Sequence, residues 1–118
     1  MQVRHVAVLG STGSIGVNTL AVVERQPERF RVVALTAHSR VDDLFAQCLR
    51  FRPLFAAISD ARAAEQLRSK LRSSGSDCEV LDGEAGLERV ASLDLIDTVV
   101  AGIVGAAGLK PALAAARG

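Results

Sequence analysis

Residues 6–16 read Val-Ala-Val-Leu-Gly-Ser-Thr-Gly-Ser-Ile-Gly, an apolar run that passes into a loop with three evenly spaced glycines. The apolar part, 6–9, is typical of a strand buried on both faces of a parallel sheet. Gly10 then allows a tight turn, Gly13 lacks the Cβ that would hold a phosphate away from the backbone, and Gly16 lets a helix pack close to the strand. The stretch therefore predicts a strand–loop–helix unit that opens on an anion-binding loop.

The rest of the chain repeats this alternation of short apolar runs and helical periodicity. Further strands are expected at 32–35, 55–58, 79–81 and 98–101. The clearest helix is expected at 41–49, where apolar residues recur at i, i+3, i+4, i+7 and i+8. A final helix is expected with an apolar stripe of Leu109, Leu113 and Ala116. Strand–helix alternation with short links predicts an α/β fold: a Rossmann-like doubly wound parallel sheet in three α/β/α layers.

Composition fits one such domain spanning 1–118. Of the 118 residues, 49% are hydrophobic but only 3% are aromatic, so the core must be aliphatic. The net charge of +1 gives no electrostatic footprint for nucleic acid or an anionic membrane. No apolar stretch reaches the roughly 18 residues of a membrane span, and the first strand begins too near Met1 for a signal peptide. We expect a soluble cytoplasmic protein whose Cys48 and Cys78 are free thiols.

The glycine loop has the spacing G-x-x-G-x-x-G, which differs from the G-x-G-x-x-G of most dehydrogenases and from a Walker loop. Its backbone N–H groups and the positive end of the helix dipole would face an anion. The hydroxyls of Ser11, Thr12 and Ser14 would add donors, and one of them is expected to cap the helix. A glycine-rich helix start can also be purely structural. Its position directly after a buried strand favours the diphosphate of a nucleotide.

The end of the second strand indicates which nucleotide binds. In an NAD-specific unit, an Asp or Glu about 20 residues beyond the glycines binds the ribose hydroxyls. Here the sequence is Thr36-Ala37-His38-Ser39-Arg40, which has no carboxylate. Arg40 can pair with a 2′-phosphate and Ser39 can donate to it, which favours NADP(H). Alternatively, Ser39 is a helix cap and Arg40 a solvated charge; His38 either stacks near the adenine or faces solvent.

A second glycine-rich stretch follows the last expected strand. Glycines recur at every third position, Gly102, Gly105 and Gly108, and Pro111 suits the first turn of a helix. In a doubly wound sheet this loop would face the first glycine loop across the cofactor crevice, as a wall beside the ribose and nicotinamide. Dense helix–sheet packing without ligand contact explains the glycines nearly as well.

Three motifs stand in a characteristic order: Gly-Ser-Thr-Gly-Ser-Ile-Gly at 10–16, Arg-Phe-Arg-Val-Val-Ala-Leu at 29–35, and Ile-Val-Gly-Ala-Ala-Gly-Leu at 103–109. Together they resemble the 1-deoxy-D-xylulose 5-phosphate reductoisomerase family, from Val6 to the last residue. The resemblance implies an NADP-dependent oxidoreductase of isoprenoid biosynthesis by the non-mevalonate pathway. Such an enzyme rearranges its substrate and reduces the product with NADPH to 2-C-methyl-D-erythritol 4-phosphate, using Mg²⁺ or Mn²⁺.

The resemblance also assigns site residues. It places the pyrophosphate and cofactor-binding loop at Thr12, Gly13, Ser14 and Ile15. It places the loop at the adenosine 2′-phosphate at His38, Ser39 and Arg40, where many family members instead have glycine, lysine and asparagine. It further implies a small-molecule substrate, a homodimer of the full-length protein, and no nucleic-acid or membrane partner.

Length separates this chain from the family. Family members are several-fold longer, and their metal-binding carboxylates, substrate-phosphate site and lid lie beyond the position of Gly118. The close acidic pairs, Asp42 with Asp43 and Asp94 with Asp97, fit element ends better than a metal site. We therefore expect the N-terminal NADP(H)-binding part of a longer enzyme, with no catalytic or metal-binding residue, that binds cofactor without turnover.

Two other functions are compatible with parts of the sequence. A free-standing nucleotide-binding or redox-sensing module would need no catalytic residues. Semialdehyde dehydrogenases also use a G-x-x-G-x-x-G loop, but they need a nucleophilic cysteine in a later domain, and Cys48 and Cys78 are poorly placed for that task.

Overall fold

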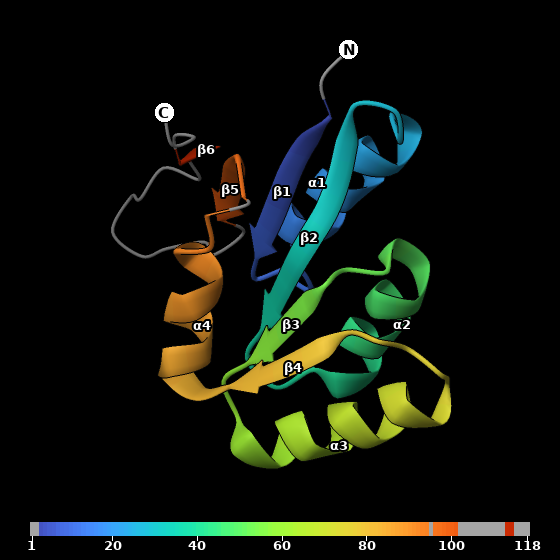
Figure 1. The fold of residues 1–118 in the computed structure, drawn as a ribbon, viewed down its shortest axis with the longest axis vertical. Helices are drawn as coiled ribbons and strands as arrows, with labels where there is room; N and C mark the ends of the chain where they lie inside the picture. Colours follow the sequence, from blue (N-terminus) through green and yellow to red (C-terminus); the bar gives the residue numbers. More distant parts are fainter. Residues whose placement is uncertain (1–2, 95, 102–112, 115–118) are drawn as a thin grey trace.

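A computed structural model describes residues 3–94, 96–101 and 113–114, which form one sheet and four helices (Figure 1). The strands are β1 (Arg4–Leu9), β2 (Phe30–Ala37), β3 (Phe55–Ile58), β4 (Glu79–Asp82), β5 (Thr98–Ala101) and β6 (Leu113–Ala114). The helices are α1 (Ser14–Arg25), α2 (Val41–Phe51), α3 (Ala61–Ser73) and α4 (Gly83–Ala91).

The sheet has the order β4-β3-β2-β1-β5-β6. Its first five strands run parallel, so their carboxyl ends and the loops that follow them share one edge. The order reverses at β1, which pairs with β2 on one side and with β5 on the other. In sheets of this kind ligands bind at such a reversal. The prediction of a Rossmann-like doubly wound sheet is confirmed.

The prediction of a last helix is wrong at Leu113. Leu113 and Ala114 instead form β6, which pairs antiparallel with β5 through Val100 and Val99. The outer edge of β5 offers unpaired backbone N–H and C=O groups, and a short extended segment satisfies them by strand pairing. Leu109 and Ala116 of the same prediction lie outside the described residues.

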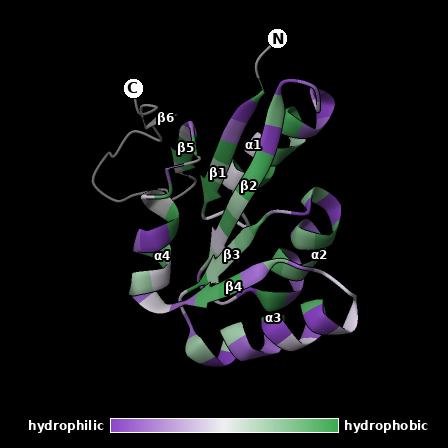
Figure 2. Ribbon diagram, in the orientation of Figure 1, coloured by the Kyte–Doolittle hydropathy of each residue, from purple (hydrophilic) through white to green (hydrophobic). Residues whose placement is uncertain are grey.

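Helices cover both faces of the sheet, in the three layers expected. One buried cluster joins β1–β4 to α1, α2 and α3, with Leu20, Leu44 and Leu67 as central residues. A second cluster on the opposite face joins the strands to α4 through Val90. Figure 1 shows α4 standing apart from α2 and α3, and Figure 2 shows apolar residues following the central strands. The core is aliphatic, as composition predicts.

Local signals set the helix ends. Helix α1 ends at Arg25, two residues before Pro27, which cannot continue a helix. Arg52 ends α2 in the left-handed region with φ +49°, and its N–H donates to the Cys48 carbonyl at 2.9 Å. Asp60 caps α3 through its side chain, which accepts from the Arg62 N–H at 2.8 Å. None of the helices in the described ranges is long and apolar enough to cross a lipid bilayer.

Candidate functional site

The glycine loop turns the chain from β1 into α1 at the carboxyl edge of the sheet. Gly10 has φ +69°, a conformation that L side chains rarely adopt, so its expected role in a tight turn is confirmed. The turn closes through a hydrogen bond from the Gly13 N–H to the Gly10 carbonyl at 3.1 Å. Gly13 is extended, with φ −82° and ψ 174°, and stands directly before the helix.

Gly16 brings α1 against this turn. A Cβ at Gly16 would lie 2.5 Å from the Ser11 Cα and 2.8 Å from the Ser11 carbonyl carbon, with the Gly10 carbonyl oxygen closer still. Real Cβ atoms essentially never lie within 3.0 Å of such neighbours. The predicted close approach at Gly16 is therefore confirmed, with the turn at Gly10 and Ser11 as the neighbour in place of the strand itself.

The start of α1 is open to a ligand. Gly13 is its N-cap and no side chain caps the helix, so the expectation of a hydroxyl cap is wrong. Within the described ranges, no hydrogen bond occupies the backbone N–H groups of Thr12, Ser14 and Ile15. The first turn also has no acidic residue that would repel an anion. Free N–H groups at the positive end of a helix dipole form an anion-binding site.

Ser11 does not add a donor to this surface, contrary to expectation. Its side chain is fully buried, at 0% exposure, and its Oγ lies 2.6 Å from Gln47 Oε1 and 3.2 Å from the Thr36 carbonyl oxygen. Gln47 in turn donates from Nε2 to the Ser11 carbonyl at 2.9 Å. Thr36 Oγ1 accepts from the Gly10 N–H at 2.9 Å. The Ser11 hydroxyl, which the sequence predicted to face the phosphate, is instead buried and stabilises the loop from its interior side.

The supporting roles of Gln47 and Thr36 were not predicted from the sequence, although each residue gives a weak signal. Thr36 is a buried polar residue, 3% exposed, in an otherwise apolar strand end. Gln47 lies three residues after the buried Leu44 and one before the buried Cys48, so its polar side chain borders the apolar stripe of α2. Both positions indicate a buried hydrogen-bonding partner, but sequence alone does not identify that partner.

The loop after β2 lies at the same edge of the sheet, next to the glycine loop. The Ser11 N–H donates to the Thr36 carbonyl at 2.8 Å, which joins the two chain segments at the end of their strands. His38, Ser39 and Arg40 follow, and all three are exposed. The structure thus brings the two sets of predicted site residues to neighbouring strand ends.

Arg40 is available to an anion. Its side chain is 70% exposed, and its Nη1 lies 3.5 Å from Asp43 Oδ2 one helical turn away, a surface ion pair of little strength. Arg40 is the N-cap of α2, and no side chain caps that helix. The alternative role of Ser39 as a side-chain cap is therefore wrong. The second glycine loop, with Gly102, Gly105, Gly108 and Pro111, lies outside the described residues.

A family model described as 1-deoxy-D-xylulose 5-phosphate reductoisomerase matches residues 6–118 of this chain. The chain belongs to this reductoisomerase family. Membership confirms the resemblance seen in the sequence, and it overturns the semialdehyde dehydrogenase alternative.

Several reductoisomerases show the extent of the similarity. The enzyme of Nitrosomonas europaea is 57% identical over 114 residues, which cover 97% of this chain and 28% of that protein. A crystal structure of DOX-P reductoisomerase in complex with NADPH, fosmidomycin and magnesium has 46% identity and a TM-score of 0.84 over 91% of this chain and 26% of that one. The Zymomonas mobilis reductoisomerase in complex with NADPH has 38% identity and a TM-score of 0.81 over 88% and 27%. The chain therefore spans about 28% of the length of the curated reductoisomerases that it matches.

The acidic pairs do not converge as metal ligands. Asp42 lies 3.5 Å from Lys70 Nζ, and Asp43 faces Arg40. Asp97 accepts the His5 N–H at 2.9 Å at the opposite, amino edge of the sheet, and this backbone hydrogen bond lowers the pKa of the Asp97 carboxyl. Among the described residues, no group of three or more His, Cys, Asp or Glu side chains could hold a metal ion. His5 thus lies at the edge of the sheet opposite to the glycine loop.

Both cysteines are free, and they adjoin each other between α2 and the start of β4. A side-chain hydrogen bond with Cys78, together with burial, raises the pKa of the Cys48 thiol. The same hydrogen bond lowers the pKa of Cys78. Cys48 is buried on α2 and Cys78 half-buried. Neither is at the carboxyl edge where the glycine loop lies.

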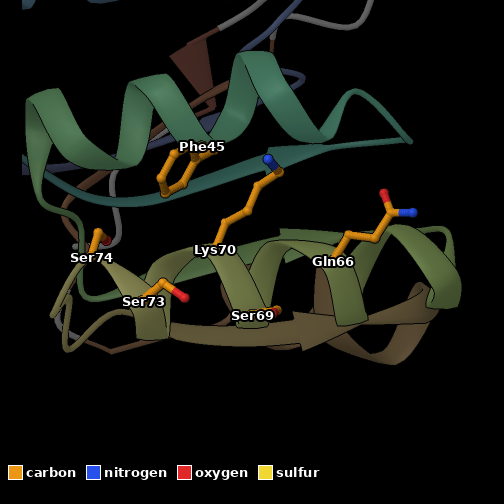
Figure 3. A pocket seen from close by; sticks show the side chains of 6 residues that line it. All are labelled: Phe45, Gln66, Ser69, Lys70, Ser73 and Ser74. Carbon is orange, nitrogen blue, oxygen red and sulfur yellow. The ribbon is translucent and has the colours of Figure 1, made fainter.

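A groove lies between α2 and α3, away from the glycine loop, and is lined by Phe45, Gln66, Ser69, Lys70, Ser73 and Ser74. Figure 3 shows Lys70 of α3 reaching toward the ring of Phe45 on α2. The Lys70 Nζ lies 5.6 Å from the centroid of that ring, a cation–π contact, and also pairs with Asp42. This ion pair is as long and as exposed to solvent as the one between Arg40 and Asp43, so it is weak as well.

Proposed function

We propose that this chain, residues 1–118, is the NADP(H)-binding domain at the N-terminal end of a longer 1-deoxy-D-xylulose 5-phosphate reductoisomerase. One observation carries the proposal: the unpaired N–H groups at the start of α1 and the exposed side chain of Arg40 follow two neighbouring strands, β1 and β2, at the same edge of the sheet. NADPH needs a site for its pyrophosphate and a second site for its 2′-phosphate. The two loops supply one of each.

The pyrophosphate binds at Thr12, Gly13, Ser14 and Ile15. The N–H groups of Thr12, Ser14 and Ile15 donate to its oxygens, because no acceptor in the described part of the chain occupies them. Gly13 is exposed and carries no side chain, so the phosphates can approach the backbone closely.

The 2′-phosphate binds at His38, Ser39 and Arg40. Arg40 exchanges its exposed partner Asp43 for the phosphate, with which a guanidinium forms stronger charge-assisted hydrogen bonds. Ser39 donates its hydroxyl, and His38 packs beside the adenosine. A carboxylate, which would select NADH, is absent from 36–40.

The full-length protein rearranges 1-deoxy-D-xylulose 5-phosphate and reduces the product to 2-C-methyl-D-erythritol 4-phosphate, for which bound NADPH supplies the hydride. The related structures contain NADPH, fosmidomycin and magnesium, which supports this assignment. Mg²⁺ or Mn²⁺ binds to residues outside this chain, so the chain alone binds cofactor without turnover. The full-length protein works as a cytoplasmic homodimer on this small substrate, without a nucleic-acid or membrane partner.

Calorimetric titration with NADPH and NADH tests the cofactor assignment. Arg40→Glu should raise the Kd for NADPH by roughly 10- to 100-fold, the effect of losing hydrogen bonds to a charged group, and should change NADH binding little. Arg72→Glu makes the same charge change at an exposed position in the last turn of α3, at the other end of the helix, and serves as the control. Equal losses of affinity for both cofactors would remove the case for binding of the 2′-phosphate.

An activity assay tests the domain assignment. We expect reductoisomerase activity in the full-length protein and none in residues 1–118. An inactive full-length protein would favour a nucleotide-binding module.

A further inference from the structure

The Ser11–Gln47 pair takes no part in the cofactor contacts proposed above, yet it holds the loop that makes them. Ser11 Oγ lies 2.6 Å from Gln47 Oε1, and Gln47 Nε2 donates to the Ser11 carbonyl at 2.9 Å. A carbonyl oxygen can only accept, so it fixes which end of the Gln47 amide faces it. Both polar ends of that amide are therefore committed to one residue of the glycine loop.

Thr36 supports the same loop from a different element. Its Oγ1 accepts the Gly10 N–H at 2.9 Å, and its carbonyl accepts the Ser11 N–H at 2.8 Å. These bonds join the loop to the end of β2. They do not fix the orientation of α2 relative to the loop, which depends on other contacts.

Gln47 supplies such a contact, because it belongs to α2. That helix begins immediately after His38, Ser39 and Arg40, and Arg40 is its N-cap. Gln47 lies two turns into the helix, about 10 Å from its start at a rise of roughly 1.5 Å per residue. A hydrogen-bonded helix moves as a rigid unit over this length, so fixing Gln47 against Ser11 also fixes the position of Arg40.

We propose that Gln47 is a positioning residue that sets the separation between the pyrophosphate loop and the 2′-phosphate loop, and thereby supports discrimination between NADPH and NADH. The inference rests on the proposed function of these two loops. NADPH presents both phosphate groups on one adenosine, so its binding depends on their protein partners standing at a fixed distance. NADH lacks the 2′-phosphate and depends on the glycine loop alone.

The test compares Gln47→Met with wild type in the full-length protein. Methionine keeps the length of the side chain and removes both hydrogen bonds to Ser11. The Kd for NADPH should rise by about tenfold, equivalent to roughly 1.4 kcal/mol, and the preference for NADPH over NADH should fall by at least about threefold. Gln66→Met, at an exposed position of α3, is the matched control and should change neither value. Urea unfolding of each variant reports stability separately.

The outcomes separate the two proposals. A wild-type protein that does not bind NADPH overturns the proposed function. A Gln47→Met protein that is less stable but keeps the wild-type cofactor preference overturns the positioning role, because a merely structural role would produce that result. If Gln47→Met does not fold, Ser11→Ala decides. That variant removes the shorter of the two bonds, and it should lower the cofactor preference in the same direction by a smaller factor; an unchanged preference overturns the inference.

Discussion

Replacing Gly16 with alanine tests the closest approach in the structure, that of α1 to the glycine turn. The new methyl would lie 2.5 Å from the Ser11 Cα, against a practical minimum of 3.0 Å, so the helix must withdraw by at least 0.5 Å. The Ser11 Cα, the Ser11 carbonyl carbon and the Gly10 oxygen are all backbone atoms. None of them can rotate away as the end of a side chain would.

Two opposing effects set the magnitude. Forcing an extra methyl against rigid neighbours costs about 3 kcal/mol, the upper end for overpacking. Alanine inside a helix gains about 1 kcal/mol over glycine. We therefore expect Gly16→Ala to lower the free energy of unfolding by about 2 kcal/mol. The withdrawal of α1 would also displace the free N–H groups of its first turn, so NADPH binding should weaken as well.

Urea denaturation followed by circular dichroism measures the stability change, and calorimetry measures the binding. Asn18→Ala, at an exposed position two residues further along α1, is the control and should be neutral or slightly stabilising. A Gly16→Ala protein that is at least as stable as wild type would refute the reasoning, because the clash would then cost no more than the roughly 1 kcal/mol gained in helix propensity.

Three further predictions concern other parts of the chain. Gly13→Ala should weaken NADPH binding by about tenfold in calorimetry. The φ of −82° at this position suits alanine, but the added methyl would occupy the space through which the phosphates approach. An unchanged affinity would indicate that the pyrophosphate binds elsewhere. Asp60→Ala should lower the free energy of unfolding by about 1 kcal/mol in urea denaturation, since it removes the cap of α3, whereas Asp60→Asn should keep most of it. Iodoacetamide should alkylate Cys78 before Cys48 near neutral pH, because the Cys78 pKa is lowered and the Cys48 pKa is raised; equal rates by mass spectrometry would contradict this order.

Sequence could predict the backbone path of the site but not its supporting contacts. The turn at Gly10 and the close approach at Gly16 follow from what the lack of a Cβ permits, and this property is local to each residue. The partners of Ser11 are not local. Gln47 lies 36 residues away, and only the packing of α2 against the loop brings the two together. A hydroxyl in a glycine-rich loop is equally suited to a phosphate or to the protein interior, so its direction could not be read from the sequence.

The fold was predictable for a similar reason, and the error at Leu113 has a physical cause. Alternation of apolar strands and amphipathic helices is encoded in the sequence over short windows. The pairing of Leu113 and Ala114 with β5 depends instead on an unsatisfied strand edge elsewhere in the chain. A helical spacing of leucine and alanine carries no information about that edge.

At the uncapped start of α1, the stability of the helix and its affinity for an anion favour different residues. A serine or aspartate in place of Gly13 would give the helix a cap of its own and stabilise it by a few tenths of a kcal/mol. The same side chain would fill the space through which an anion reaches the first turn. A substitution here that raises thermal stability would thus lower the affinity of the site for its ligand. With glycine retained, the start of α1 is expected to be most stable while the ligand is bound.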